Sequence, residues 1–109
     1  MESTLEQKQL QMRKGLVEFC ILLVINEKRT YSSDILNALK KSGLLVVEGT
    51  LYPLLSRLRT QLLVDYEWEE SKSGPPRKYY VLTTKGKTLL SELKKTWAEL
   101  STSIESLIN

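Results

Sequence analysis

Histidine is absent from this chain of 109 residues, and cysteine occurs only once. Without histidine there is no imidazole for a catalytic triad, for acid–base catalysis or for holding a metal ion. No glycine-rich phosphate-binding loop is present, and the carboxylates are scattered. We therefore expect no catalytic residues, no metal site and no cofactor, and we predict that the protein is not an enzyme.

Long hydrophobic runs are missing as well. The apolar run "FCILLVI" at 19–25 has seven residues, whereas a membrane-spanning helix needs about 20. Cys20 lies inside this run, where its expected role is that of a small buried hydrophobic residue, and a lone cysteine excludes an intrachain disulfide. We expect a cytoplasmic protein in a reducing compartment, with no membrane partner.

The chain also has little excess of either charge, because its 16 cations and 13 carboxylates leave a net charge of only +3. Such a mild excess does not by itself indicate a nucleic-acid partner, so the positions of the cations matter more than their sum. A chain of 109 residues predicts one compact domain, small enough to gain stability from a partner subunit.

Apolar periodicity predicts four helices, over 6–26, 32–42, 50–61 and 84–109. The first should begin exposed and end as a buried central helix. The second should have Ser32 or Ser33 as its N-cap, Asp34 in its first turn and Gly43 just beyond its end. The last follows Thr83, a good N-cap residue.

The helix over 50–61 has two unlike faces. Its core face is a leucine stripe at helical spacing, made of Leu51, Leu54, Leu55 and Leu58. Its opposite face carries small residues between two larger ones, namely Gly49, Pro53, Ser56 and Thr60 between Tyr52 and Arg57. Solvated helix faces usually carry Glu and Lys, so this face predicts the close approach of a partner. With Thr50 as N-cap, Pro53 would be the third residue of a regular helix.

Two strands are predicted after this helix. Val64, Tyr66 and Trp68 alternate with polar residues, which is the period of a half-buried strand, and "RKYYVLT" at 77–83 returns as the second strand. The segment "SKSGPP" between them supplies the turn. Three helices, a hairpin and a final helix are the element order of a winged helix-turn-helix, so the fold class is mainly α with a two-stranded β-wing.

The final helix carries an apolar seam with heptad-like spacing. In so small a domain, little of this seam is needed to complete the chain's own core. The simplest partner for this seam is the same seam on a second copy, joined by the exposed start of the first helix. We therefore predict a winged helix-turn-helix DNA-binding region, with the N-terminal helix, over 1–83 and a C-terminal dimerisation helix over 84–109, both in one compact domain. The predicted dimer interface is Met12, Leu16, Phe19, Leu90, Leu93, Trp97, Leu100, Ile104 and Leu107.

Two motifs, "EGTLYPLLSRL" and "EWEESKSGPPRKYYVLTTKG", resemble the PadR (phenolic acid decarboxylase repressor) family of bacterial transcription regulators, in its short subclass. The similarity covers about residues 12–100. It implies a dimeric winged-helix protein that binds double-stranded DNA, usually as a repressor released by a small molecule. Two residues depart from the family pattern, Leu62 and Ser32, where the family often has glycine. A left-handed Leu62 would cost on the order of 1 kcal/mol.

The predicted DNA contacts come from the second helix start, the third helix and the hairpin tip. They are Tyr31, Ser32, Gly49, Thr50, Tyr52, Pro53, Ser56, Arg57, Lys72, Pro75, Pro76, Arg77 and Lys78. Arg57 could read a guanine edge or neutralise a phosphate, and we favour phosphate. Tyr52 would bond a phosphate or simply cover its helix. The two prolines would stiffen the tip and lower the entropy lost when its cations meet DNA.

Two alternatives stay open at this point. Some short members of the family hold flat, apolar effectors beside an aromatic residue at the dimer interface, which makes Trp97 either an effector contact or plain dimer core; we favour core. The domain as a whole could also be a winged helix that binds a protein and no DNA, because a fold does not determine a function.

Overall fold

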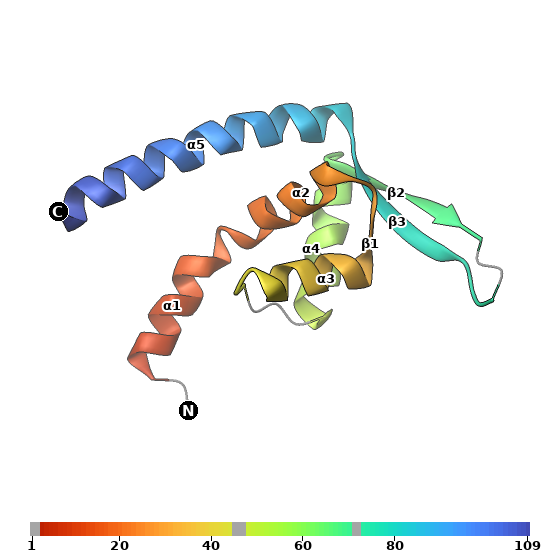
Figure 1. Cartoon of the computed structure of the whole chain (residues 1–109), viewed down its shortest axis with the longest axis horizontal. Helices are drawn as coiled ribbons and strands as arrows, with labels where there is room; N and C mark the ends of the chain where they lie inside the picture. The colour runs from red at the N-terminus through yellow and green to blue at the C-terminus, as the bar shows by residue number, and fades with distance from the viewer. Residues whose placement is uncertain (1–2, 45–47, 71–72) are drawn as a thin grey trace.

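The computed structural model describes residues 3–44, 48–70 and 73–109. Five helices and three strands follow one another along the chain (Figure 1). Their bounds are α1 Thr4–Lys14, α2 Val17–Glu27, β1 Thr30–Tyr31, α3 Ser32–Lys41, α4 Glu48–Thr60, β2 Val64–Glu69, β3 Arg77–Leu82 and α5 Thr84–Ile108. Mostly helical, with a small antiparallel sheet, this architecture confirms the predicted winged helix.

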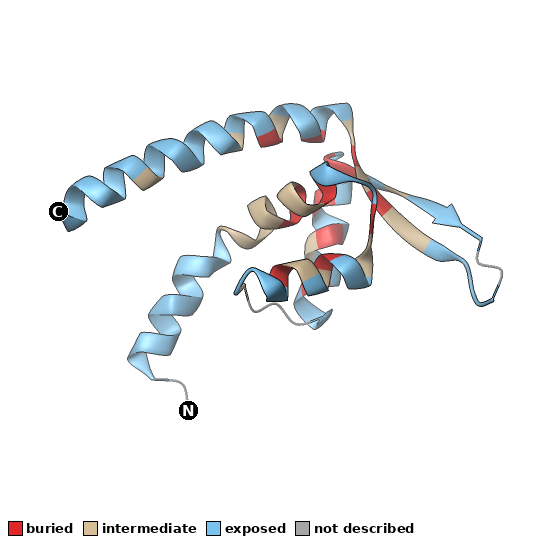
Figure 2. Ribbon diagram, in the orientation of Figure 1, coloured by how far each residue is buried: buried red, intermediate tan, exposed pale blue. Residues whose placement is uncertain are grey.

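The predicted helix over 6–26 is two helices, α1 and α2. Ser3 caps α1 by accepting a hydrogen bond from the amide of Glu6, and Gly15 ends it. The amide of Leu16 then donates to the carbonyl of Arg13 at 2.9 Å, which tightens the turn before α2 begins. No residue of α1 is buried, whereas α2 buries three (Figure 2). Core packing therefore holds α2 but not α1, and the break falls at the glycine, a poor helix former.

The core is made by α2, α3 and α4 together with the sheet and the start of α5. Its buried members are Ile21, Leu22, Ile25, Ile35, Leu39, Leu51, Leu55, Leu58, Leu63, Val64, Tyr80, Leu82 and Leu90. Burying one such side chain fully contributes about 1.5–3 kcal/mol. This apolar cluster orients α4 so that the face opposite its leucines is exposed.

The start of α3 differs from the prediction because a short strand precedes it. Tyr31, and not Ser32 or Ser33, is the N-cap, and its side chain makes no capping hydrogen bond. Thr30 and Tyr31 instead form β1, which pairs with β3 and gives the sheet the order β1-β3-β2. The two-stranded wing is confirmed, with Val64 opposite Leu82 and Glu69 opposite Arg77, and β1 is a third strand that was not predicted.

The start of α4 also differs from the prediction. The helix begins at Glu48, so Thr50 lies inside it and Pro53 is an interior residue. The missing N–H of Pro53 would have donated to the carbonyl of Gly49 four residues earlier. Both residues are exposed, so water can replace the lost hydrogen bond.

The start of α5 is locked to the end of α4. The hydroxyl of Thr83, the predicted N-cap, accepts from the amide of Gly86 at 2.9 Å and donates to the carbonyl of Leu62 at 2.7 Å. A side chain on Gly86 would place its Cβ 2.0 Å from the carbonyl oxygen of Leu63, so only glycine fits. From this anchor α5 runs away from the wing, toward the side of the molecule where α1 lies (Figure 1).

Candidate nucleic-acid interface

The outer face of α4 is exposed and built from small residues. Gly49, Thr50, Pro53 and Ser56 all lie on the surface. Opposite them, Leu51, Leu55 and Leu58 are each 1 % exposed, so the core leaves the helix no other orientation. A helix that carries small side chains on its free face can approach a partner surface closely.

Tyr52 connects this face to the start of α3. Its hydroxyl lies 3.3 Å from the hydroxyl of Ser32, and its side chain is 44 % exposed. The neighbouring Tyr31 packs against Tyr79 of the wing, with ring centroids 5.5 Å apart. Three predicted contact residues, Tyr31 of β1, Ser32 of α3 and Tyr52 of α4, therefore lie next to one another and reach the base of the wing.

The two described wing cations rest on aromatic rings. The guanidinium carbon of Arg77 lies 4.8 Å from the centroid of Tyr31. The ammonium of Lys78 lies 4.1 Å from the centroid of Tyr66 and 5.3 Å from that of Trp68. Within the described parts of the chain neither cation pairs with a carboxylate. A cation over a ring keeps its charge and its N–H donors available.

The two tyrosines of β3 differ in burial, because Tyr79 is half-buried and Tyr80 belongs to the core. Tyr80 is buried, which raises its pKa, and the nearby hydroxyls of Tyr52 and Tyr66 raise it further while Arg59 lowers it. Pro75 and Pro76 are exposed before β3 begins at Arg77. Lys72, the third predicted wing cation, lies outside the described residues.

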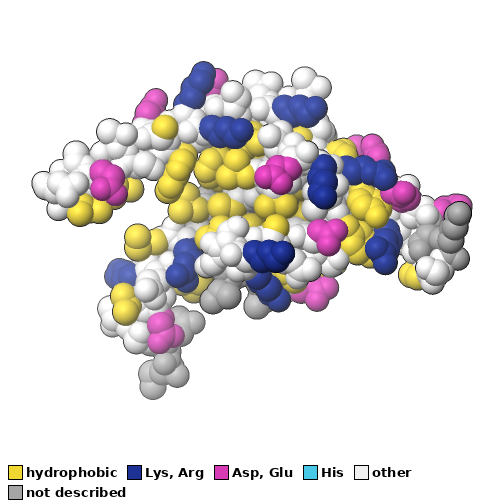
Figure 3. Space-filling model, viewed as in Figure 1, with side chains coloured by type: hydrophobic (Ala, Val, Ile, Leu, Met, Phe, Trp, Pro, Cys, Tyr) yellow, Lys and Arg dark blue, Asp and Glu magenta, His cyan; other side chains and the backbone are white. Residues whose placement is uncertain are grey.

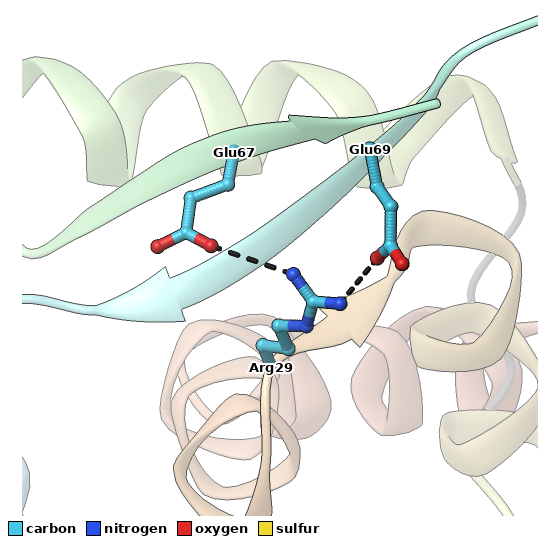
Figure 4. Close-up of polar contacts among 3 residues, drawn as sticks. All are labelled: Arg29, Glu67 and Glu69. Carbon is cyan, nitrogen blue, oxygen red and sulfur yellow. Dashed lines mark hydrogen bonds and ion pairs between the residues drawn. The ribbon is translucent and has the colours of Figure 1, made fainter. Parts of the chain in front are cut away.

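Other arginines are neutralised by carboxylates. Arg57 donates from Nε and Nη2 to one oxygen of Glu18, at 2.8 and 2.5 Å, which joins α4 to the start of α2. Arg29, at the end of the α2–β1 turn, contacts both Glu67 and Glu69 of β2 (Figure 4). The negative charges of Glu67 and Glu69 on β2 are therefore partly compensated by Arg29. Arg57 carries a paired charge where the prediction assumed a free one.

Arg59 is a surface cation that the sequence analysis missed. It lies on the same flank of α4 as Tyr52, seven residues further along, and its side chain is 52 % exposed. Its guanidinium carbon is 4.2 Å from the centroid of Tyr66, and its Nε is 3.5 Å from a carboxylate oxygen of Asp65. The seven-residue spacing from Tyr52 was the available signal.

A second surface, between α2 and α5, is apolar. Figure 3 shows hydrophobic side chains gathered along the groove below α5. Part of it is a shallow cavity of about 350 Å³ lined by Leu16, Phe19, Cys20, Leu23, Lys94 and Trp97. The rings of Phe19 and Trp97 lie 6.5 Å apart. Burial raises the pKa of the Cys20 thiol, so it stays protonated and behaves as an apolar side chain.

Five of the nine predicted members of the dimer seam are exposed in the single chain, namely Met12, Trp97, Leu100, Ile104 and Leu107. Leu16 is half-buried, and Phe19 and Leu93 are half-buried against the core. Leu90 is only 2 % exposed, because it lies one turn after the tightly docked Gly86. Leu90 is therefore a core residue of the single chain, which leaves it little surface to offer the predicted dimer interface.

No group of three or more metal-binding side chains lies together among the described residues. Within the same ranges, no helix has both the length and the apolar character that crossing a membrane requires.

Comparisons with known proteins identify relatives along most of the chain. Residues 21–92 match the model of the transcriptional regulator PadR-like family. A PadR-like transcription factor from Bacteroides fragilis is 50 % identical, with 93 % of this chain and 98 % of that one covered and a TM-score of 0.77. A PadR-like regulator from Bacillus cereus is 39 % identical over 91 % of this chain and 97 % of its own, with a TM-score of 0.84. An uncharacterised protein of Lysinibacillus sphaericus is 33 % identical over 84 % of this chain and 87 % of its own length.

Proposed function

The chain belongs to the PadR-like family of transcriptional regulators, and from this premise we propose that it regulates transcription by binding double-stranded DNA as a homodimer. The solved relatives named above are described as transcription factors or regulators, and none of those descriptions names an enzyme.

One observation supports DNA as the partner above all others. The small-residue face of α4 lies beside a wing whose cations, Arg77 and Lys78, are held on aromatic rings and not on carboxylates. In the proposed complex the first half of α4 enters the major groove, with Thr50, Tyr52 and Ser56 nearest to the DNA. The wing cations meet phosphates or the adjacent minor groove, and the two prolines limit the entropy that the tip loses.

The proposed dimer joins two copies through α5, with help from α1 and the start of α2. The exposed apolar side chains Trp97, Leu100 and Ile104 support this, because their spacing of three and four places them on one side of the helix. A twofold dimer would present two α4 helices to half-sites of an inverted repeat, about one helical turn apart.

We propose that the regulator acts as a repressor whose DNA binding is controlled by a small, flat, apolar effector. The cavity beside Trp97 and Phe19 supports such a ligand, because its lining is mainly apolar and it adjoins the dimer seam. An effector there would change DNA affinity by favouring one arrangement of the two subunits over another.

Duplex binding measured over a series of salt concentrations tests the DNA proposal. DNA binding predicts that the logarithm of the affinity falls steeply with the logarithm of salt, by about 0.9 units for each phosphate contacted. A winged helix that binds only protein predicts weak duplex binding with little salt dependence. That second result would remove DNA as the partner.

A further inference from the structure

A groove separates α4 from the wing, and both polar and apolar side chains line it. Its volume is about 410 Å³, and its walls include Ser56, Arg59 and Thr60 from α4 with Tyr66 and Lys78 from the wing. Thr60 uses its hydroxyl proton on the carbonyl of Ser56 at 3.0 Å, whereas no described contact occupies the hydroxyl of Ser56. Among the described lining residues, the groove therefore offers the hydroxyl of Ser56 and two cations, next to the carboxylate of Asp65.

The two cations are held by the same ring. The guanidinium carbon of Arg59 is 4.2 Å and the ammonium of Lys78 is 4.1 Å from the centroid of Tyr66. Arg59 contacts Asp65 only through Nε, at 3.5 Å, so its two terminal amino groups keep their donors. Because the ring already orders both side chains, an incoming anion would cost less side-chain entropy than at two freely moving cations.

Two other arginines, Arg29 and Arg57, differ from Arg59 because they have close carboxylate partners. Arg29 contacts two carboxylates and Arg57 contacts one, so an anion would have to displace those partners. Arg59 and Lys78 are restrained by aromatic rings and, for Arg59, by one long contact with Asp65. Unlike Arg29 and Arg57, these two groove cations could therefore meet an anion without displacing a close carboxylate partner.

We propose that Arg59 and Lys78 together bind one phosphate ester in this groove, with the Ser56 hydroxyl as a further donor. This phosphate ester is a phosphodiester of the DNA backbone, so the inference rests on the proposed function. It adds Arg59 to the residues that contact DNA. A phosphate held by α4 and β3 at once ties the recognition helix and the wing to one point of the backbone. Such a contact sets the register of the protein on DNA without reading its sequence.

The test compares salt dependence for four proteins on a random-sequence duplex: wild type, Arg59→Gln, Lys78→Gln and the double variant. Because both residues hold the same phosphate, the double variant should lose about one unit of the log–log slope, and each single variant no more than that. Lys95→Gln on α5 removes the same charge from an exposed residue remote from the wing and should leave the slope unchanged.

Three results would overturn the shared site: no loss in the double variant, a loss of about two units, or an equal loss in Lys95→Gln. If duplex binding by the wild type shows no salt dependence, the proposed function fails. If the wild type has a steep salt slope and the double variant has the same slope, only the proposed phosphate site in the groove fails. Arg59→Lys is the control for a structural effect of replacing Arg59. It keeps the positive charge, so the salt slope of duplex binding should stay unchanged.

Backbone amide chemical shifts distinguish DNA from a free anion as the source. In the wild type, DNA should shift the amides of Ser56, Arg59 and Lys78, and inorganic phosphate at constant ionic strength should shift them no more than chloride does. A saturable shift with inorganic phosphate as well would identify a small-anion site of the same chemistry. Unmoved amides with both ligands would overturn the proposal.

Discussion

Two helices end in the same backbone motif with different residues at its strained position. After α3, the amide of Gly43 donates to Lys40 and that of Leu44 to Leu39. After α4, the amide of Leu62 donates to Arg59 and that of Leu63 to Leu58. Gly43 has φ +84° and Leu62 has φ +64°. Both endings are Schellman motifs, in which glycine is favoured at the left-handed residue, so the leucine carries strain that the glycine does not.

Leu62→Gly should therefore raise the free energy of unfolding by up to about 1 kcal/mol, measured by urea denaturation. The Leu62 side chain is 66 % exposed, so little packing is lost. The matched control is Gly43→Leu, which introduces the same strain after α3 and should lower stability by a similar amount. A less stable Leu62→Gly protein would mean that its side chain packs more than its exposure indicates.

At the scale of elements, the ion pair between Glu18 and Arg57 joins α4, the proposed DNA-binding helix, to the apolar surface between α2 and α5. Glu18 lies on α2 between Leu16 and Phe19, which line the cavity beside Trp97. The pair is partly exposed, so its contribution to stability is small. Its main consequence is electrostatic, because it neutralises a cation on the edge of the α4 face.

Glu18→Gln should strengthen duplex binding and steepen its salt dependence by up to one log–log unit, since it releases Arg57 to meet a phosphate. Fluorescence anisotropy with a labelled duplex would measure both quantities. Glu92→Gln on α5 also removes a paired, exposed carboxylate and should change neither. Unaltered binding by Glu18→Gln would show that Arg57 lies too far from the DNA to contact it.

For the whole molecule, the single chain leaves its longest helix half uncovered. The first turns of α5 pack on the core through Leu90, while its apolar residues from Trp97 onward are exposed. Figure 2 shows the exposed second half of this helix. The α1 helix is exposed along its entire length and ends near the same side of the molecule (Figure 1). Two uncovered elements at the end opposite the wing are what a twofold dimer with outward-facing wings requires.

Trp97→Asp should convert the protein into monomers, because each dimer would bury two carboxylates in the apolar seam. Sedimentation velocity would detect the smaller species, and duplex affinity should fall with it. Trp68→Asp places the same substitution on the exposed wing and should leave the dimer intact. A dimer of normal stability in Trp97→Asp would place the interface elsewhere.

Local sequence patterns predicted most of the elements and several of their ends. The leucine stripe of α4, the alternation at Val64 and Tyr66, and the cap at Thr83 all appear in the structure as expected. The errors fall where two local preferences competed. Pro53 favoured a later start for α4 than the structure has, and the apolar stripe through Leu16 hid the break after Gly15.

Side-chain partnerships were a different matter. Sequence alone determined which residues could form helices, strands and a cationic wing, because those preferences act between residues a few positions apart. Only the tertiary structure decided which cations have a carboxylate partner, because the carboxylates that pair with Arg29 and Arg57 lie 38 to 40 residues away along the chain. The same packing placed β1 beside β3, Leu90 in the core and Arg59 over Tyr66. Contacts of this range depend on how the hydrophobic core stacks the elements, and no local periodicity records that.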